Sequence, residues 1–161
     1  MVKELLVICP TFITLPLKTK KDKKVSINLN TYRNLHFLVE SKCKKAFKEA
    51  VRSQIEGVEI QSPIEVTYKV YKASARRLDK MNVVSICSKY IMDALSELGC
   101  IEDDNDEVVK KEIILPTRFN QLFPGSIFRK YPITMTTKNE GNIPAITLLK
   151  KTNISNLSIF Q

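Results

Sequence analysis

The run VVSICSKYIMDALSEL, residues 83–98, predicts the helix around which the rest of the fold is arranged. Its apolar residues recur every three or four positions, which gathers them on one broad face of an α-helix. Those residues are Val83, Val84, Ile86, Cys87, Tyr90, Ile91, Ala94, Leu95 and Leu98. Gly99 follows the run, at the position where a left-handed residue often ends a helix. Asn82 precedes it and is a natural N-cap, so we expect a buried helix over residues 83–98.

The segments upstream predict a second helix and a strand. After Asn30, taken as an N-cap, apolar residues at helical spacing predict an amphipathic helix over residues 32–54. The outer face of this helix is basic, with Lys42, Lys44, Lys45 and Lys48. Residues 63–73 alternate apolar and polar side chains, which is typical of a half-buried strand. A first strand or hairpin is expected at residues 5–17, and further strands are expected at residues 108–116 and 145–151.

The order of these elements predicts an α/β (α+β) fold, with a small mixed sheet packed by two main helices. With 43% hydrophobic residues in a chain of 161, we expect a single domain over residues 1–161. Residues 117–142 have no clear period and are expected to form an irregular insertion. Residues 152–161 are expected to form a flexible tail.

Composition narrows the class of function. The formal charge is +9, which favours a polyanion such as nucleic acid as partner. No apolar run is long enough to span a membrane, so a soluble cytoplasmic protein is expected. The four cysteines have apolar neighbours and no CxxC pair, which favours buried thiols over disulfides or zinc. One histidine, His36, leaves no Ser-His-Asp constellation, and neither a P-loop nor GxGxxG is present.

Three short segments concentrate charge. RRLDKMN at residues 76–82 precedes the central helix, KTKKDKK at 18–24 holds five lysines, and EDDNDE at 102–107 is acidic in a basic chain. Lysine-rich and acidic segments are often only solvated loops, and Asn82 serves equally as a helix cap or as a polar ligand. Hard carboxylate oxygens, however, are the ligands that Mg²⁺ prefers, and arginines commonly position phosphates.

Two parts of the chain together resemble the RusA family of Holliday junction resolvases. The first is DKMN at residues 79–82, followed by Lys89 and by MDALSELGCIEDDNDEV at residues 92–108. The second is SINLNTYRNLHF at residues 26–37, which is similar to the region that leads into the first helix of phage members. The Lys-x-x-x-Asp-Ala-Leu and Glu-Asp-Asp-Asn patterns are the specific parts of this resemblance.

The resemblance implies a Mg²⁺-dependent endodeoxyribonuclease, with Mn²⁺ able to substitute. Such an enzyme resolves four-way DNA junctions by paired symmetric nicks as a homodimer, here in a bacterial host cytoplasm if the protein is phage-encoded. The motif implies Asp79, Lys89 and Asp104 as catalytic residues, and Asp79, Asp103 and Asp104 as metal ligands. Contacts to DNA are expected from Arg33, Arg76, Arg77, Lys80, Asn82, Lys21, Lys23 and Lys24.

Two positions depart from the family pattern. Met81 stands where many members carry a second aspartate, and its side chain does not ligate a hard cation. Lys89 lies seven residues beyond Asn82 instead of three, which adds close to one helical turn but keeps both residues on one polar stripe. An alternative hypothesis is therefore a RusA-like DNA-binding or protein-interaction module without cleavage. A third, an inhibitor of a host nuclease, rests only on residues 117–142.

Overall fold

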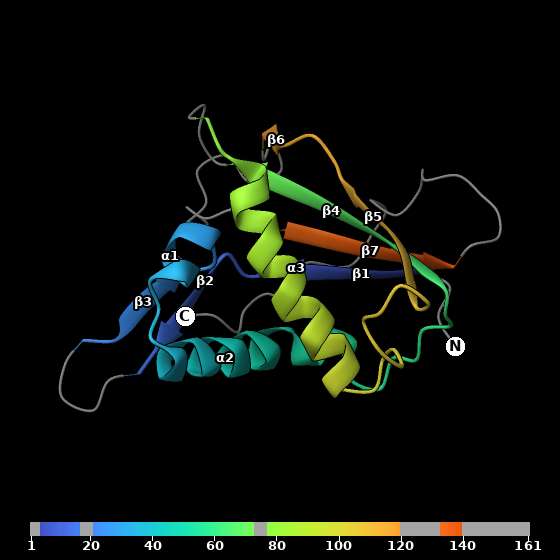
Figure 1. Cartoon of the computed structure of the whole chain (residues 1–161), viewed down its shortest axis with the longest axis horizontal. Coiled ribbons are helices and arrows are strands. Elements are labelled where there is room, and N and C mark those ends of the chain that lie inside the picture. Colours follow the sequence, from blue (N-terminus) through green and yellow to red (C-terminus); the bar gives the residue numbers. More distant parts are fainter. Residues whose placement is uncertain (1–3, 17–20, 73–76, 120–132, 140–161) are drawn as a thin grey trace, which may run out of the picture.

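The computed structural model of the chain describes residues 4–16, 21–72, 77–119 and 133–139. In these residues a five-stranded mixed sheet and a two-stranded ribbon combine with three helices, which confirms the predicted α+β class (Figure 1). No helix in this part of the chain is long and apolar enough to cross a lipid bilayer.

The main sheet contains β1 (Glu4–Cys9), β4 (Ile64–Lys72), β5 (Val109–Ile114), β6 (Arg118–Phe119) and β7 (Ile133–Asn139). Its order is β1, β7, β4, β5, and the short strand β6 also pairs with β4. β7 is antiparallel to both of its neighbours, whereas β5 and β6 are parallel to β4. β7 therefore joins the first strand of the described chain to the rest of the sheet.

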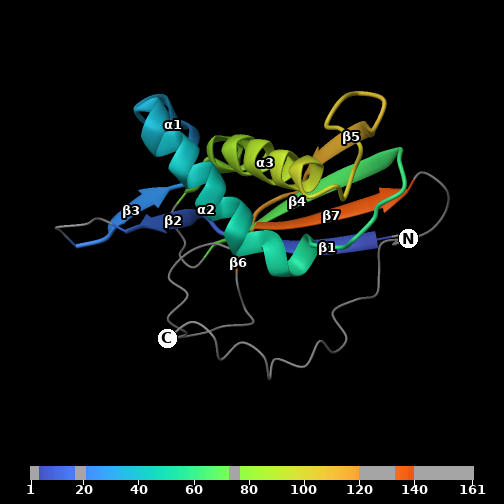
Figure 2. The same ribbon diagram turned by 90° about the horizontal axis from the view of Figure 1, so that it is seen from below.

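The remaining elements are α1 (Leu29–Arg33), α2 (Phe37–Ile55), α3 (Lys80–Glu97) and the antiparallel ribbon of β2 (Phe12–Leu15) and β3 (Lys23–Ser26). α3 lies across one face of the main sheet, and α2 packs against α3 and β1 (Figures 1 and 2). α1, the start of α2 and the ribbon lie at the same end of the molecule (Figure 1). α1 also packs on α3.

The core fills the space between the sheet and the two long helices. Its largest fully buried side chains are Val7, Phe47, Val51, Ile55, Ile64, Val66, Tyr68, Tyr90, Ile91 and Leu95. Alternate residues of β4 are buried, as the period of two in the sequence predicts. All four cysteines are buried free thiols, which confirms that prediction.

α3 confirms the predicted central helix, although it begins three residues earlier than expected. Asp79 is its N-cap: one carboxylate oxygen accepts hydrogen bonds from the backbone N–H groups of Met81 and Asn82, at 3.1 and 3.2 Å. The prediction that Asn82 caps the helix is therefore wrong, because the preceding carboxylate already satisfies the free N–H groups. Gly99 follows the helix with φ +70°, the left-handed conformation expected there.

The single helix predicted over residues 32–54 is two helices. α1 begins after Asn28, whose side chain accepts from the Thr31 N–H at 2.8 Å, so Asn30 is not the cap. The helical backbone stops at Asn34, and α2 begins after His36, whose Nδ1 accepts from the Leu38 N–H at 3.3 Å. Side chains that bond to nearby backbone N–H groups favour such a restart over one continuous helix.

Two further expectations change. Residues 5–17 contribute two strands, β1 and β2, which belong to different sheets. The segment 117–142 contains β6 and β7, so the expectation of an irregular insertion is wrong for residues 133–139. The predicted strand at 145–151 and the tail at 152–161 lie outside the described residues.

Candidate nucleic-acid interface

The polar stripe of α3 is in direct contact with α1. The backbone N–H of Asn30 donates to Asn82 Oδ1 at 3.3 Å. Seven residues further along α3, Lys89 Nζ donates to the Tyr32 hydroxyl at 3.0 Å and lies 5.2 Å from the centre of the Tyr32 ring. The two segments that carry the family resemblance, far apart in the sequence, therefore meet at two points in the fold.

α1 is held in place for these contacts by its own short-range bonds and by its aromatic side chain. The Asn34 amide donates to the Asn30 carbonyl at 2.7 Å, which closes the turn after the helix. Tyr32 is half-buried, and its ring packs edge-on against Tyr90 of α3 with 6.5 Å between ring centres. The Tyr32 hydroxyl is thereby fixed beside Lys89.

Lys89 is the cation of this site. Its side chain is exposed, and the hydrogen bond with Tyr32 raises the pKa of Lys89 above its ordinary value. Lys89 is consequently charged at neutral pH, and its ammonium group lies beside Tyr32 of α1. An ammonium group held in this way can bind a phosphate oxygen, whereas the resemblance implies a catalytic role for Lys89.

Asp79 was predicted to be a metal ligand and Asn82 to be the cap, but Asp79 itself caps α3. Its carboxylate lies at the positive end of α3 and closes the first helical turn, so helix capping alone explains an aspartate here. Asp79 is nevertheless exposed, so its carboxylate remains in contact with solvent.

The acidic segment forms a self-bonded loop between α3 and β5. Asp103 accepts from the Asp104 N–H at 2.8 Å and from the Asn105 amide at 3.0 Å. These bonds lower the pKa of Asp103 below its ordinary value. Asn105 in turn accepts from the N–H groups of Glu107 and Val108, at 2.9 and 3.2 Å. Local turn formation thus accounts for several polar residues of the loop.

The three implied metal ligands are not brought together within one chain. Asp79 precedes α3 and Asp103 and Asp104 follow it, and α3 has 18 residues, a length of about 27 Å. Among the described residues, no group of three or more Asp, Glu, His or Cys side chains is arranged to hold a metal ion. Asp79, Asp103 and Asp104 of a single chain therefore do not form one Mg²⁺ site.

Most of the predicted DNA-contacting side chains are exposed. Lys21, Lys23 and Lys24 lie on or before β3, Arg33 ends α1, and Arg77 precedes α3; we call these five residues the basic end. The acidic loop lies at the opposite end of α3 (Figure 1).

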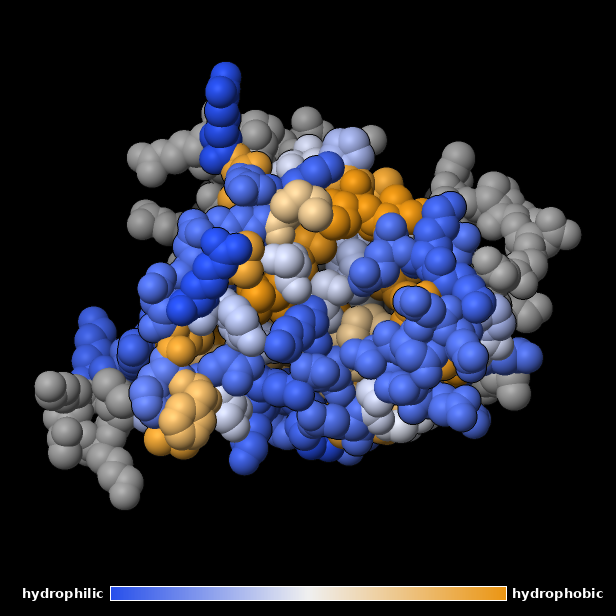
Figure 3. Space-filling view, viewed as in Figure 1, coloured by the Kyte–Doolittle hydropathy of each residue, from blue (hydrophilic) through white to orange (hydrophobic). Residues whose placement is uncertain are grey.

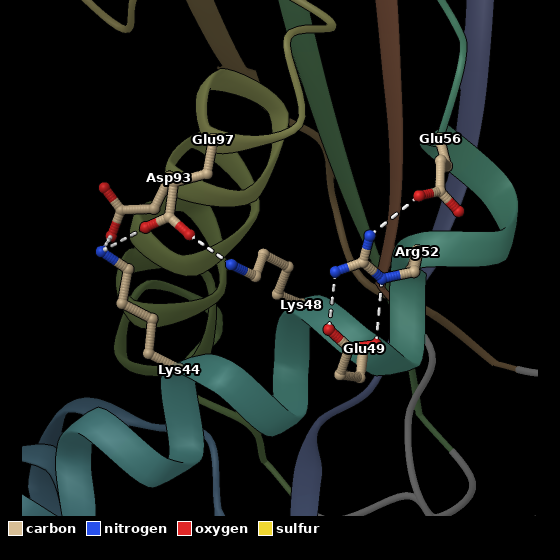
Figure 4. Close-up of polar contacts among 7 residues, drawn as sticks. All are labelled: Lys44, Lys48, Glu49, Arg52, Glu56, Asp93 and Glu97. Carbon is tan, nitrogen blue, oxygen red and sulfur yellow. Dashed lines mark hydrogen bonds and ion pairs between the residues drawn. The ribbon is translucent and has the colours of Figure 1, made fainter.

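Other predicted cations have protein partners. Lys80 is half-buried, and its Nζ donates to the Ile114 carbonyl of β5 at 3.5 Å, which directs it toward the sheet. Lys44 and Lys48 of α2 form ion pairs with Asp93 and Glu97 of α3, so they join the two helices (Figure 4). Arg76 lies outside the described residues.

Sequence reasoning missed Asn30 and Tyr32 as parts of this site. The motif TYRN was noted, but no periodic signal links residue 32 to residue 89. Neither a comparison with known protein families nor a search of curated proteins finds a match to this chain. The resemblance to RusA therefore rests on the motifs and on the contacts between them.

Proposed function

We propose that this protein binds branched DNA and, as a homodimer that uses Mg²⁺ or Mn²⁺, cuts four-way junctions in the manner of the RusA endodeoxyribonucleases. One observation carries the proposal. The two separate stretches of family resemblance contact each other through Asn30 with Asn82 and Tyr32 with Lys89. The two stretches form the neighbouring elements α1 and α3, so their polar residues share one surface, as the residues of a single site must.

The charge distribution supports DNA as the partner. The basic end and Lys89 offer exposed cations along α1, β3 and the start of α3, where a phosphate backbone can run. Such contacts position the nucleic acid without reading its sequence, which suits a protein that recognises the shape of a junction. Buried free thiols agree with action in the reducing cytoplasm of a bacterial host.

The separation of the carboxylates explains why a homodimer is part of the proposal. In a two-fold dimer whose α3 helices lie antiparallel, the start of each α3 is next to the end of the other. Asp79 of one subunit then approaches Asp103 and Asp104 of the partner subunit, and two equal sites form. The basic end of each subunit also faces the acidic loop of the other, which favours this arrangement electrostatically.

Cleavage of a labelled four-way junction tests the activity. Wild-type protein with Mg²⁺ or Mn²⁺ is expected to give paired nicks that EDTA abolishes and that Asp104→Asn lacks. Asp79→Asn is the matched variant at the other end of α3, because asparagine caps a helix as well as aspartate does. Loss of cleavage in this variant therefore reports on the carboxylate and not on the helix.

Mixing the two inactive variants tests the dimeric site. If each site combines Asp79 of one subunit with Asp104 of the other, a mixed dimer has one intact site and restores single nicks. If each site lies within one chain, every site in the mixture is defective and no cleavage returns. A monomeric protein that cleaves junctions would also contradict the dimeric site.

The second candidate is a RusA-like protein that binds branched DNA without cutting it. It is favoured by the dispersed carboxylates of the single chain and by Met81, which is 54% exposed at the position where the family pattern has an aspartate. Tight, Mg²⁺-independent junction binding with no cleavage in Mg²⁺ or Mn²⁺ would establish this function in place of the first.

A further inference from the structure

The first turn of α2 exposes two large apolar side chains next to the basic end. Phe37 is 70% exposed and Leu38 is 56% exposed, the two highest values among the large hydrophobic residues described. The space-filling view shows apolar surface among hydrophilic residues at the end of the molecule that carries the start of α2 (Figure 3). Leaving both apolar side chains in contact with water is unfavourable for the monomer. A binding role would explain why they are exposed.

The Phe37 ring has a defined neighbour. His36 is the N-cap of α2, with Nδ1 bonded to the Leu38 N–H, and this bond fixes the imidazole at the start of the helix. The His36 and Phe37 ring centres are 4.6 Å apart, with 33° between the ring planes. The two rings form a continuous aromatic surface at the outside of the molecule.

Exposed cations lie near the start of α2: Arg33 comes four residues before Phe37, and Lys42 and Lys45 follow Leu38 by four and seven positions on the same helix face. Arg33 at the end of α1 and Lys42 and Lys45 on α2 are exposed, and none of them joins the ion pairs of the described residues. The nearest acidic residue of the helix is Glu40, which is half-buried in its first turn. Lys44, on the same helix, differs from these three cations because it forms ion pairs with Asp93 and Glu97.

We propose that this surface stacks an unpaired nucleic-acid base on Phe37 while the neighbouring cations bind the flanking phosphates. We call it the Phe37 platform, and it comprises His36, Phe37, Leu38, Arg33, Lys42 and Lys45. An exposed aromatic ring within a cationic surface is the arrangement by which proteins hold single-stranded nucleotides. Two apolar side chains offer too little area for a stable protein interface, whereas one ring suffices for one base. The inference rests on the proposed function, because the bases of a four-way junction are paired and the protein must unpair one at the branch point for that base to stack on Phe37.

The chain contains no tryptophan, which permits a direct optical test. Phe37→Trp introduces a single indole at the platform, and stacking of a base on it quenches its fluorescence. The titrants are a dT oligonucleotide, a four-way junction and a fully paired duplex of equal length. We expect saturable quenching by the oligonucleotide and the junction, and less than a fifth of that quenching by the duplex, by analogy with stacking worth roughly 1–3 kcal/mol per base.

Three further variants separate stacking from apolar contact. Phe37→Ala and Phe37→Leu should both weaken oligonucleotide binding by roughly 5- to 150-fold, because neither side chain has a ring face. Leu6→Ala, at an apolar residue of β1 that is 52% exposed and lies outside the platform, is the matched control and should change the affinity less than twofold. Circular dichroism should be unchanged in all three, because these side chains are exposed and the His36 cap remains.

The proposal is overturned if saturating oligonucleotide leaves the indole fluorescence of Phe37→Trp unchanged, or if Phe37→Leu binds the oligonucleotide like the wild type. Equal affinity in Phe37→Leu, together with a changed oligomeric state in Phe37→Ala, would assign the surface to a protein contact instead. These readouts need no cleavage. Quenching without nuclease activity would overturn the proposed enzyme alone, and cleavage without quenching would overturn the platform alone.

Discussion

The ion pairs between α2 and α3 permit a comparison between two lysines one helical turn apart. Lys44 Nζ lies 2.9 Å from Asp93 Oδ2 and 3.2 Å from Glu97, whereas Lys48 Nζ pairs with Glu97 alone at 2.7 Å (Figure 4). The partners differ in burial, because the Asp93 side chain is 24% exposed, with Oδ2 inaccessible to solvent, whereas the Glu97 side chain is 42% exposed. We expect Lys44→Met to destabilise the protein much more than Lys48→Met.

The expected magnitude follows from the burial of the partner oxygen. At 2.9 Å and an effective dielectric constant of about 20, the gross attraction of Lys44 to Asp93 is about 6 kcal/mol. Desolvation and side-chain ordering cancel most of this value. What remains is about 2 kcal/mol, the typical contribution of a charged hydrogen bond to a partly buried group. Loss of Lys48 from its exposed partner should cost less than about 1 kcal/mol.

Urea unfolding of the two variants measures this difference. Methionine keeps most of the aliphatic contact of lysine, so the change reports mainly on charge. In a double-mutant cycle, Asp93→Asn should recover about 1–2 kcal/mol in the Lys44→Met background, because no buried charge is then left unpaired. Equal destabilisation by the two lysine substitutions, or no recovery by Asp93→Asn, would refute the argument from burial.

The same cluster predicts the direction of the pH dependence. The pairing with Asp93 raises the pKa of Lys44 above 10.5, so its contribution is complete below 10.5 and is lost as pH rises through the raised value. The pairing with Lys48 and Lys44 lowers the pKa of Glu97 below 4.5, so its contribution is present above 4.5 and is lost as pH falls through the lowered value. The wild type should therefore lose its advantage over Lys44→Met at both extremes, which unfolding at pH 3, 7 and 11 would show.

Three further substitutions test other parts of the structure. Gly99→Ala forces a side chain into the left-handed conformation at φ +70° and should cost about 1–2 kcal/mol in urea unfolding, whereas an unchanged midpoint would mean that the turn relaxes. Gln54→Ala removes two hydrogen bonds to the edge strand β1, where the Gln54 amide accepts from the Ile8 N–H at 2.8 Å and donates to the Ile8 carbonyl at 3.0 Å. We expect the free energy of unfolding to fall by about 1–2 kcal/mol. Light scattering should show concentration-dependent association through the uncovered strand edge. Tyr32→Phe keeps the ring but removes the hydroxyl that orients Lys89. The affinity for a four-way junction should fall by roughly threefold, while the thermal midpoint stays unchanged. Full affinity in this variant would show that Lys89 needs no positioning by Tyr32.

The elements with strong periodicity could be predicted from the sequence. α3 and β4 each place nearly all of their apolar residues on one buried face, so their type followed from spacing alone. The break between α1 and α2 could not be predicted in this way, because the apolar spacing continues across Asn34 and His36 while local side-chain bonds interrupt the backbone. Periodicity reports which face is buried, but it does not report which residue caps a helix.

β7 illustrates a second limit. Its sequence ITMTTKN has little hydrophobic contrast, and it was expected to be irregular. The strand forms because β1 and β4 pair with it on both sides, and β1 is separated from it by more than a hundred residues. Such pairing depends on partners far away in the chain, which a window of neighbouring residues does not contain.

The contacts of α1 also explain the unusual spacing of the family-like motif. Asn82 and Lys89 are seven residues apart, which is about 10 Å along α3, and the rotation returns both to the same stripe. α1 spans this interval: its Asn30 backbone meets Asn82, and Tyr32 meets the end of the long Lys89 side chain. The added turn therefore keeps Lys89 on the exposed surface that α1 shares with α3. A variant that shortens α3 by one turn would move Lys89 away from Tyr32, and its junction affinity would fall even if the helix were otherwise intact.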